Sequence, residues 1–190
     1  MKPERVCAFT DGVIAIIITI MVLELPVPHE PGWNALRPVL PLFAIYALSF
    51  TKVGIYWVNH HHLLCAARKV DGRVLLANLF QLFWLSLVPW VMRWIGEAGL
   101  TRDTVLAFGA IMLMSALGFA SIRFALLNAN DDDAPIVKAT SHGRKGQITL
   151  IAYLAALPIT FVSPSASIAI YVIVALMWLI PDKRFEGLNE

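Results

Sequence analysis

Charged residues are scarce in this chain, and that scarcity excludes most classes of soluble protein. Only 15% of the 190 residues are Asp, Glu, Lys or Arg, whereas 58% are apolar. An average globular domain has roughly 25% charged and 45–50% apolar residues. The net charge of +2 is too small for a nucleic-acid-binding surface to dominate the chain. Because this composition suits neither a soluble enzyme nor a disordered tail, we expect a membrane protein.

Cysteines and long polar segments are also few. Cys7 and Cys65 cannot form the disulfide framework of a small secreted domain. The connections between apolar stretches are too short for an aqueous domain. The longest, residues 128–146, holds the run Asp131-Asp132-Asp133 and His142. We interpret it as a solvated loop, since a cation site would need further oxygen ligands at a recognisable spacing.

Six apolar windows are present, and a membrane-spanning helix needs about 20 mostly apolar residues. The windows cover residues 6–25, 38–65, 74–95, 104–127, 147–162 and 165–180. Proline-containing breakers follow the first window and divide the last two. The sequence therefore predicts an all-α integral membrane protein with six transmembrane helices in one domain over residues 1–190. The last two windows are short, which leaves their crossing of the bilayer an open question.

The distribution of Lys and Arg predicts the orientation in the membrane. With the N-terminus inside, three basic residues lie outside: Arg37, Arg93 and Arg102. Ten lie inside: Lys2, Arg5, Arg68, Lys69, Arg73, Lys138, Arg144, Lys145, Lys183 and Arg184. This asymmetry favours both termini in the cytoplasm. A cleaved signal peptide is the alternative for the first window, but no small-x-small cleavage site follows it.

The first window carries charge only at its rims. Asp11 lies just inside one end and Glu24 at the other, and the twelve residues between them, 12–23, are uncharged. At 1.5 Å per residue they span about 18 Å of helix. A charge at the bilayer centre costs roughly 2.5–3.5 kcal/mol on translocon-based scales. The segment is therefore predicted to be an apolar cylinder with polar rims.

Polar residues gather at the start of this window. Arg5 and Phe9 are four residues apart and share a helix face, whereas Asp11 lies about 120° from Arg5 and does not pair with it. Each charge is therefore expected to find partners on other helices. Alternatively, Arg5 extends to the membrane interface, and Thr10 and Asp11 merely cap a helix.

Three consecutive histidines, His60, His61 and His62, end the second window. Neighbouring helical residues point about 100° apart, whereas helices chelate metals through i,i+3 or i,i+4 pairs. We therefore expect neither a metal centre nor a haem. A hydrogen-bonding cluster that satisfies Asp11, Thr10 or Arg5 on the first window is the better hypothesis, and Asn78 near the start of the third window could join it.

These residues carry a resemblance to a known family. The run Arg5-x-x-x-Phe9-Thr10-Asp11-Gly12 resembles the R-x-x-x-F-S-D signature of the transmembrane protein 175 family of potassium channels, with Thr10 in place of the usual serine. Trp57-x-x-His60-His61, Asn78 and Pro89-Trp90 are similar to the second and third spans of that family. A single signature in one six-span unit resembles the prokaryotic branch and not the two-repeat animal proteins.

The resemblance implies a homotetramer in a lipid bilayer whose four first spans line a central cation pore. It also implies a pore without the carbonyl filter of ordinary potassium channels, and the sequence has no T-V-G-Y-G-like stretch. Carried over residue by residue, the constriction falls on Ile16, Thr19 and Leu23, with Ile20 adjacent. Spacings of three and four place these side chains within about 100° of one another on a helix.

Each pore position suggests a role. Rings of Ile16 and Leu23 would form apolar collars that gate by dewetting. A Thr19 ring offers oxygens to a partly dehydrated ion, which favours K⁺ over Na⁺ modestly, and Glu24 concentrates cations at the outer mouth. A further set is expected to fix the packing of the pore helix: Arg5, Phe9, Thr10, Asp11, Trp57, His60, His61 and Asn78. Lipid contact or ordinary bundle packing is the alternative for the Ile and Leu face.

Three other functions are compatible with an apolar chain of this size. A small secondary transporter or proton-coupled carrier would use Asp11 and His60–His62 as a relay, but the inverted repeats typical of such carriers are not evident. An intramembrane metalloenzyme would need more ligands at matched depth, and a structural membrane protein would transport nothing. We therefore expect a potassium-permeable channel in the cell membrane of a prokaryote, without a cofactor, enzymatic activity or a nucleic-acid partner.

Overall fold

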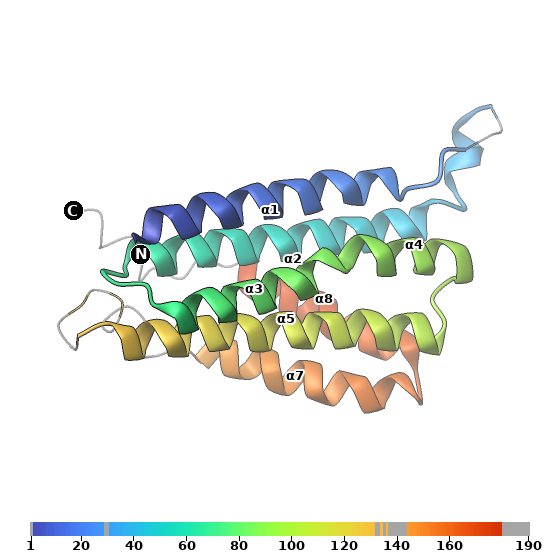
Figure 1. Cartoon of the computed structure of the whole chain (residues 1–190). Coiled ribbons are helices and arrows are strands. Elements are labelled where there is room, and N and C mark those ends of the chain that lie inside the picture. Colours follow the sequence, from blue (N-terminus) through green and yellow to red (C-terminus); the bar gives the residue numbers. More distant parts are fainter. Residues whose placement is uncertain (1, 29–30, 132–133, 135, 137–143, 180–190) are drawn as a thin grey trace.

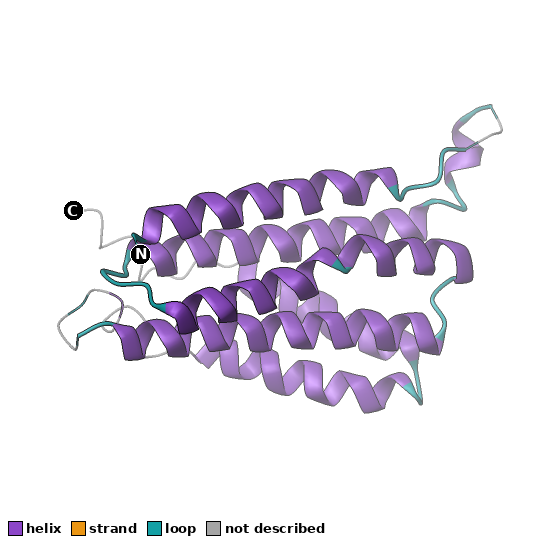
Figure 2. Ribbon diagram, in the orientation of Figure 1, coloured by secondary structure: helices purple, strands orange, loops and turns teal. Residues whose placement is uncertain are grey.

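The computed structural model describes residues 2–28, 31–131, 134, 136 and 144–179, and all the regular secondary structure in these residues is helical. Long helices lie side by side, and α4 continues in the direction of α3 (Figure 1). Short loops join α2 to α3, α4 to α5 and α7 to α8 (Figure 2). The helices are α1 Pro3–Leu23, η1 Trp33–Leu36, α2 Leu40–Cys65, α3 Gly72–Ser86, α4 Val88–Ala98, α5 Arg102–Ala129, α7 Arg144–Thr160 and α8 Pro164–Leu179. The prediction of an all-α protein is confirmed.

Proline and capping residues define where the helices begin. Pro3 occupies the first turn of α1, where its missing N–H costs nothing. The Asp71 carboxylate accepts hydrogen bonds of 3.0 Å from the backbone N–H groups of Arg73 and Val74 at the start of α3. Thr101 forms a reciprocal capping box with Thr104 at the start of α5. These local signals explain why the observed helix starts lie within a few residues of the predicted ones.

The third apolar window, predicted as a span over residues 74–95, forms one membrane-length helical stretch, Gly72–Ala98, with an interruption inside it. It is divided at Leu87 into α3 and α4. Pro89 lies in the first turn of α4, where it has no N–H to donate to the carbonyl of Leu85 one turn earlier. The hydropathy pattern continues through this break, so the apolar run alone did not reveal it.

Four helical stretches of the described chain are long and apolar enough to cross a membrane: Pro3–Leu23, Leu40–Leu64, Gly72–Ala98 and Arg102–Ala129. The helices α7 and α8 have 17 and 16 residues, or about 25 Å of helix against a hydrocarbon core of about 30 Å. Their crossing of the bilayer, and hence the six-span count, stays a prediction.

Helices α3 and α5 approach each other closely at Gly118. A Cβ atom added to Gly118 of α5 would lie 2.8 Å from the Cα atom of Gln81 on α3. Only glycine allows the two backbones to approach so closely. Behind this contact, one apolar core joins α1, α2, α3, α4, α5, α7 and α8, and a smaller one lies around Val74, Ile122 and Leu126.

One end of the bundle collects most of the basic residues. The start of α1, the ends of α2 and α5 and the starts of α3 and α7 share this end (Figure 1). The basic residues in or beside these helix termini are Lys2, Arg5, Arg68, Lys69, Arg73, Arg144 and Lys145. Others assigned to the same side, Lys138, Lys183 and Arg184, lie outside the described residues, as do Asp132, Asp133 and His142.

Candidate functional site

Helix α1 has one face buried in the bundle and another left exposed. The buried residues follow spacings of three and four along the helix: Val6, Thr10, Ile14, Ile17 and Met21. On the exposed side, the side chains of Ile16, Ile20 and Leu23 are 58%, 40% and 78% accessible. Thr19 is exposed as well. The four residues proposed for the constriction therefore share the face of α1 that the rest of the chain does not cover.

The Thr19 hydroxyl is oriented by its own helix. Its Oγ1 atom lies 3.0 Å from the carbonyl oxygen of Ala15 and 2.9 Å from that of Ile16, and it donates its proton to this carbonyl pair. A hydroxyl has one proton and two acceptor lone pairs. Because the proton is directed back to the helix, the oxygen presents its lone pairs on the exposed face, as a cation ligand would require.

A buried hydrogen-bonded group joins α1, α2 and α3. Thr10 is completely buried, and its Oγ1 atom accepts a hydrogen bond of 3.0 Å from Asn78 Nδ2 and lies 3.2 Å from Asn78 Oδ1. The Asn78 oxygen also lies 2.8 Å from His60 Nε2. One amide thus links a residue from each of three helices, and it fixes which face of α1 points inward.

A second contact lies one residue further along α1. The indole Nε1 of Trp57 on α2 donates a hydrogen bond of 2.8 Å to Asp11 Oδ1. The Trp57 ring also packs beside His61, with ring centroids 6.4 Å apart. The Asp11 carboxylate thus has an indole N–H as a partner. The spacing of residues in the sequence does not distinguish an indole donor on α2 from a histidine donor.

Two residues of the expected packing set do not join these contacts. The Arg5 side chain is exposed, and Phe9 is 53% accessible. Both lie on the same side of α1 as the uncovered apolar face, four residues apart. If these two residues help to pack the pore helix, they do so by contacting neighbouring copies of the chain. Their packing role stays a prediction.

A groove of about 440 Å³ runs between α1 and α4 beside the exposed face. Ile16, Ile20 and Glu24 line it from α1 and the residue that follows it, and Trp90 and Arg93 line it from α4. Arg93 Nε donates to Glu97 Oε1 at 3.0 Å, one turn along its own helix. The sequence reasoning missed Arg93 as a neighbour of Glu24. Because the two positions lie 69 residues apart in the sequence, only the fold brings them together.

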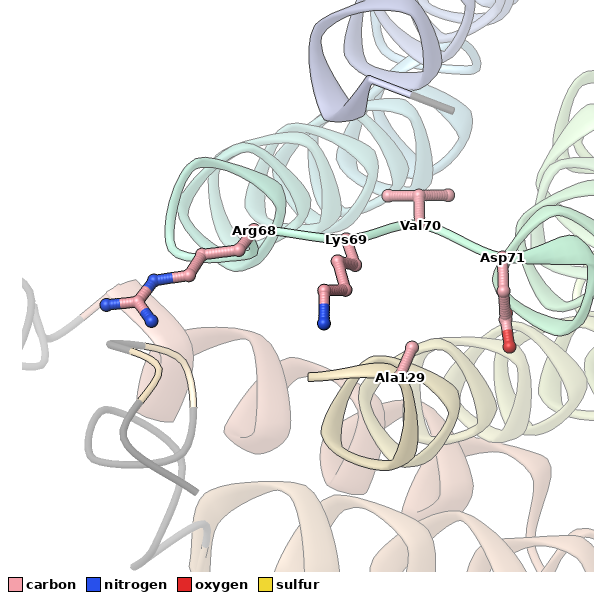
Figure 3. A pocket seen from close by; sticks show the side chains of 5 residues that line it. All are labelled: Arg68, Lys69, Val70, Asp71 and Ala129. Carbon is pink, nitrogen blue, oxygen red and sulfur yellow. The ribbon is translucent and has the colours of Figure 1, made fainter. Parts of the chain in front are cut away.

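Another hollow, of about 370 Å³, lies at the basic end, far along the bundle from Glu24. It is lined by Arg68, Lys69, Val70, Asp71 and Ala129, and the Lys69 and Asp71 side chains extend to its α5 side (Figure 3). Asn130 holds this turn, since its Oδ1 atom accepts from the backbone N–H groups of Arg68 and Lys69 at 2.8 and 2.9 Å. Lys69 also pairs with Asp131 at 3.2 Å.

The described residues contain no cluster of three His, Cys, Asp or Glu side chains that would hold a metal ion. His61 and His62 are adjacent on α2, and their rings lie 6.1 Å apart in an edge-on arrangement. His60 points into the bundle to Asn78. The three side chains diverge around α2, as the helical spacing predicts.

Comparison with known proteins identifies relatives across the whole chain. The model of the family described as "Endosomal/lysosomal potassium channel TMEM175" matches residues 5–89. A potassium channel of Chryseobacterium sp. is 44% identical over 186 residues, which cover 98% of this chain and 97% of that protein. A potassium channel of Streptomyces collinus is 30% identical and covers 92% of this chain and 90% of its own length.

A solved structure has the same fold. The crystal structure of a lysosomal potassium-selective channel TMEM175 homologue from Chamaesiphon minutus superposes with a TM-score of 0.73 and covers 94% of this chain and 96% of that one. The sequence identity is 23%, so this likeness shows the fold. The full-length match to the Chryseobacterium protein goes further. The chain belongs to the TMEM175 family, a family of multi-pass membrane ion channels and not of enzymes.

Proposed function

We propose that four copies of the chain form a potassium-permeable channel whose pore is lined by the exposed face of α1. The observation that carries the proposal is the incomplete burial of this helix. Only 28% of the apolar stretch of α1 is buried within the chain, against 56% for that of α5. A helix with one face anchored by hydrogen bonds and an opposite face left open is suited to packing around a symmetry axis. The names of the two full-length relatives support potassium as the permeant ion.

Within this pore, apolar and polar rings would alternate along α1. Ile16 and Leu23 lie seven residues, or about 10 Å, apart along the helix. Rings of these side chains would make two collars that water enters reluctantly, and opening them would wet the pore. The Thr19 oxygens lie between the collars and would replace part of the hydration shell of the ion. Since K⁺ sheds water at a lower cost than Na⁺, such a ring favours K⁺ by a modest ratio.

The buried contacts behind α1 would hold these rings in register. The amide of Asn78 and the indole of Trp57 fix Thr10 and Asp11, which lie about two and a half turns from Thr19, toward the basic end. A rotation of α1 that removed Thr19 from the axis would break both contacts. We therefore assign positioning roles to Thr10, Asp11, Trp57, His60 and Asn78, and extend that assignment to His61, Arg5 and Phe9 through contacts within the tetramer.

The two ends of the pore would differ in charge. Glu24 lies at the end of α1 opposite the basic cluster, where four carboxylates would attract cations to the mouth. The positive charge of Arg93 in the same groove is partly offset by its ion pair with Glu97. The basic end carries the residues that favour a cytoplasmic location. We therefore propose that both termini lie in the cytoplasm of a prokaryotic cell and that Glu24 faces outward.

Ion flux from liposomes containing the purified protein tests this function. A passive K⁺ efflux that exceeds Na⁺ efflux and needs no proton gradient is expected. The variant Ile16→Trp, which fills the proposed pore, should abolish most of the flux. The matched variant Ile173→Trp, on an α8 side chain that is 64% exposed, should leave it unchanged. Saturating K⁺ transport that requires a pH gradient would indicate a carrier instead, and equal effects of both tryptophans would place the pore elsewhere.

A further inference from the structure

A lysine lies buried in the middle of a proposed membrane span, away from the α1 face. Lys52 is the thirteenth of the 26 residues of α2, so it is about 18 Å from either end of that helix. Its side chain is only 3% exposed. An ionisable residue at this depth is costly and is commonly part of a functional site. The proposed pore mechanism makes no use of it.

The ammonium of Lys52 lacks a carboxylate partner among the described residues. Its Nζ atom lies over the ring of Tyr153 on α7, 5.1 Å from the ring centroid. This cation–π contact stabilises a positive charge but supplies no hydrogen-bond acceptor. All three ammonium protons therefore remain available to a ligand.

Four buried hydroxyls accompany Lys52 without a hydrogen-bond partner in the described structure. Ser49 and Tyr56 lie three residues before and four residues after it, on the same face of α2. Tyr153 comes from α7 and Tyr171 from α8, and their rings pack edge-on with centroids 5.7 Å apart. Each of the four residues is more than nine-tenths buried, and each hydroxyl is unpaired.

Other hydroxyls of the same helical hairpin are fully satisfied, which makes this group distinctive. Thr160 and Ser167 are completely buried and bond to each other at 2.9 Å, and both lie within 2.9 Å of the carbonyl oxygen of Ala156. The packing of α7 against α8 therefore gives the hydroxyls of Thr160 and Ser167 hydrogen-bond acceptors within the hairpin. Tyr153 and Tyr171 lie in the same hairpin, but neither hydroxyl forms a hydrogen bond of standard geometry in the described structure. The Tyr171 hydroxyl lies beside Thr160 and against Gly109 of α5.

The group is rich in donors, and Lys52 is its one side chain that can carry a positive charge. An unpaired buried donor is costly, and a buried charge is costly unless a counter-charge accompanies it. An anion satisfies both requirements, because it accepts several hydrogen bonds and neutralises the ammonium. We propose that each subunit binds a small inorganic monovalent anion, such as chloride, between α2, α7 and α8, held by Lys52 and the surrounding tyrosine and serine hydroxyls.

This anion site is separate from the proposed permeation path. It is built from three helices of a single chain, and none of its residues belongs to α1. Its existence does not require the chain to conduct K⁺ or to form a tetramer. A bound anion would cross-link α2 to the α7–α8 hairpin and would stabilise the subunit.

Thermal unfolding of the full-length protein tests the proposal. The unfolding midpoint is measured in potassium gluconate at constant ionic strength while gluconate is replaced by chloride or bromide. The wild type should show a saturable rise of the midpoint, because ligands that bind only the folded state stabilise it. Lys52→Met keeps the length of the side chain and should remove this rise. Lys69→Met, which removes an exposed ammonium paired with Asp131, should retain it.

Tyrosine variants keep the test decisive even if Lys52→Met fails to fold. Tyr153→Phe and Tyr171→Phe keep the ring and should each raise the half-saturating chloride concentration about threefold to tenfold, the loss expected for one hydrogen bond. Tyr46→Phe, outside the group, should not. A bromide peak beside Lys52 in anomalous diffraction would locate the ion. A wild type indifferent to chloride, or a chloride response that survives in Lys52→Met or in both Phe variants, would overturn the proposal.

Discussion

At the scale of single residues, two threonines on α1 show how position decides the use of one side chain. Thr10 and Thr19 are nine residues apart, which places them on opposite faces of a helix. Thr10 is buried and bonded to Asn78, whereas Thr19 is exposed and bonds only to its own backbone. The first anchors the helix, and in the proposed pore the second meets the ion.

Removing the Thr19 hydroxyl should weaken the preference for K⁺. In Thr19→Ala the proposed ring loses the oxygens that replace water around the ion, while the helix and its buried face are unaltered. The loss of about 0.5–1.5 kcal/mol expected for one such contact corresponds to a twofold to tenfold lower K⁺/Na⁺ permeability ratio, measured by reversal potentials. Thr19→Ser keeps the hydroxyl and should keep the ratio. An unchanged ratio in Thr19→Ala would refute the threonine-ring mechanism.

Replacing Asn78 should destabilise the protein without a direct effect on the ion. Asn78→Ala leaves both Thr10 and His60 buried without their partner, at a cost of about 1–3 kcal/mol. A lower unfolding midpoint of the purified protein is therefore expected. Asn59→Ala is a suitable control, because Asn59 is partly buried and bonds only to the backbone carbonyl of Ile55. Equal midpoints for the two variants would mean that the Thr10–Asn78–His60 group contributes little.

The sequence allowed part of this site to be foreseen, and the reason is geometric. Helical spacing places Ile16, Thr19 and Leu23 on one face before any tertiary contact is known. It does not specify which donor reaches Asp11, because Trp57 and the histidines lie on the same turn and a half of α2. The choice of Trp57 depends on the rotation and offset of α2 against α1, which only the packed structure shows.

At the scale of helices, the lengths of the apolar windows predicted the positions of the helices well. They did not predict the interruption inside the third window or the close packing of α3 against α5. The third window is long enough for one span, yet Leu87 and Pro89 divide it into α3 and α4. Hydropathy averages over about 19 residues and does not register a single missing hydrogen bond. Backbone contacts are equally hidden from it. The close approach of α3 and α5 depends on one glycine, and the apolar pattern contains nothing that marks that position.

A methyl group at Gly118 should separate α3 from α5. In Gly118→Ala the new Cβ would lie 2.8 Å from Cα of Gln81, a backbone atom that moves only with its helix. Overpacking of this kind costs about 1–3 kcal/mol, and a lower unfolding midpoint is expected. Gly54→Ala on α2 meets no atom within 4 Å and should be neutral or slightly stabilising. The interpretation fails if both alanines shift the midpoint by the same amount.

At the scale of the whole molecule, the apolar surface has two kinds of partner that look alike in the sequence. Leu23 on α1 and Ile173 on α8 are 78% and 64% exposed, and both are aliphatic. Lipid tails and a neighbouring subunit bury such side chains equally well, because lipid tails are as apolar as the aliphatic side chains of a protein. Composition therefore cannot say which face is lined by subunits. The buried polar contacts do distinguish the faces of α1. The contacts of Thr10 and Asp11 hold one face inside the bundle and leave the opposite face for assembly.

Single-cysteine cross-linking should separate the two surfaces. In a background with Cys7 and Cys65 replaced by serine, Leu23→Cys would bring identical residues of neighbouring subunits together around the proposed axis. A disulfide needs Cα atoms about 4.4–6.8 Å apart. Equivalent residues around a narrow pore come close to this distance, whereas equivalent residues that face lipid lie much further apart. Oxidation should therefore convert Leu23→Cys, but not Ile173→Cys, into covalent dimers on a denaturing gel, and the intact assembly should have the mass of four chains. Dimers from Ile173→Cys alone would move the subunit interface to α8 and would remove α1 from the pore.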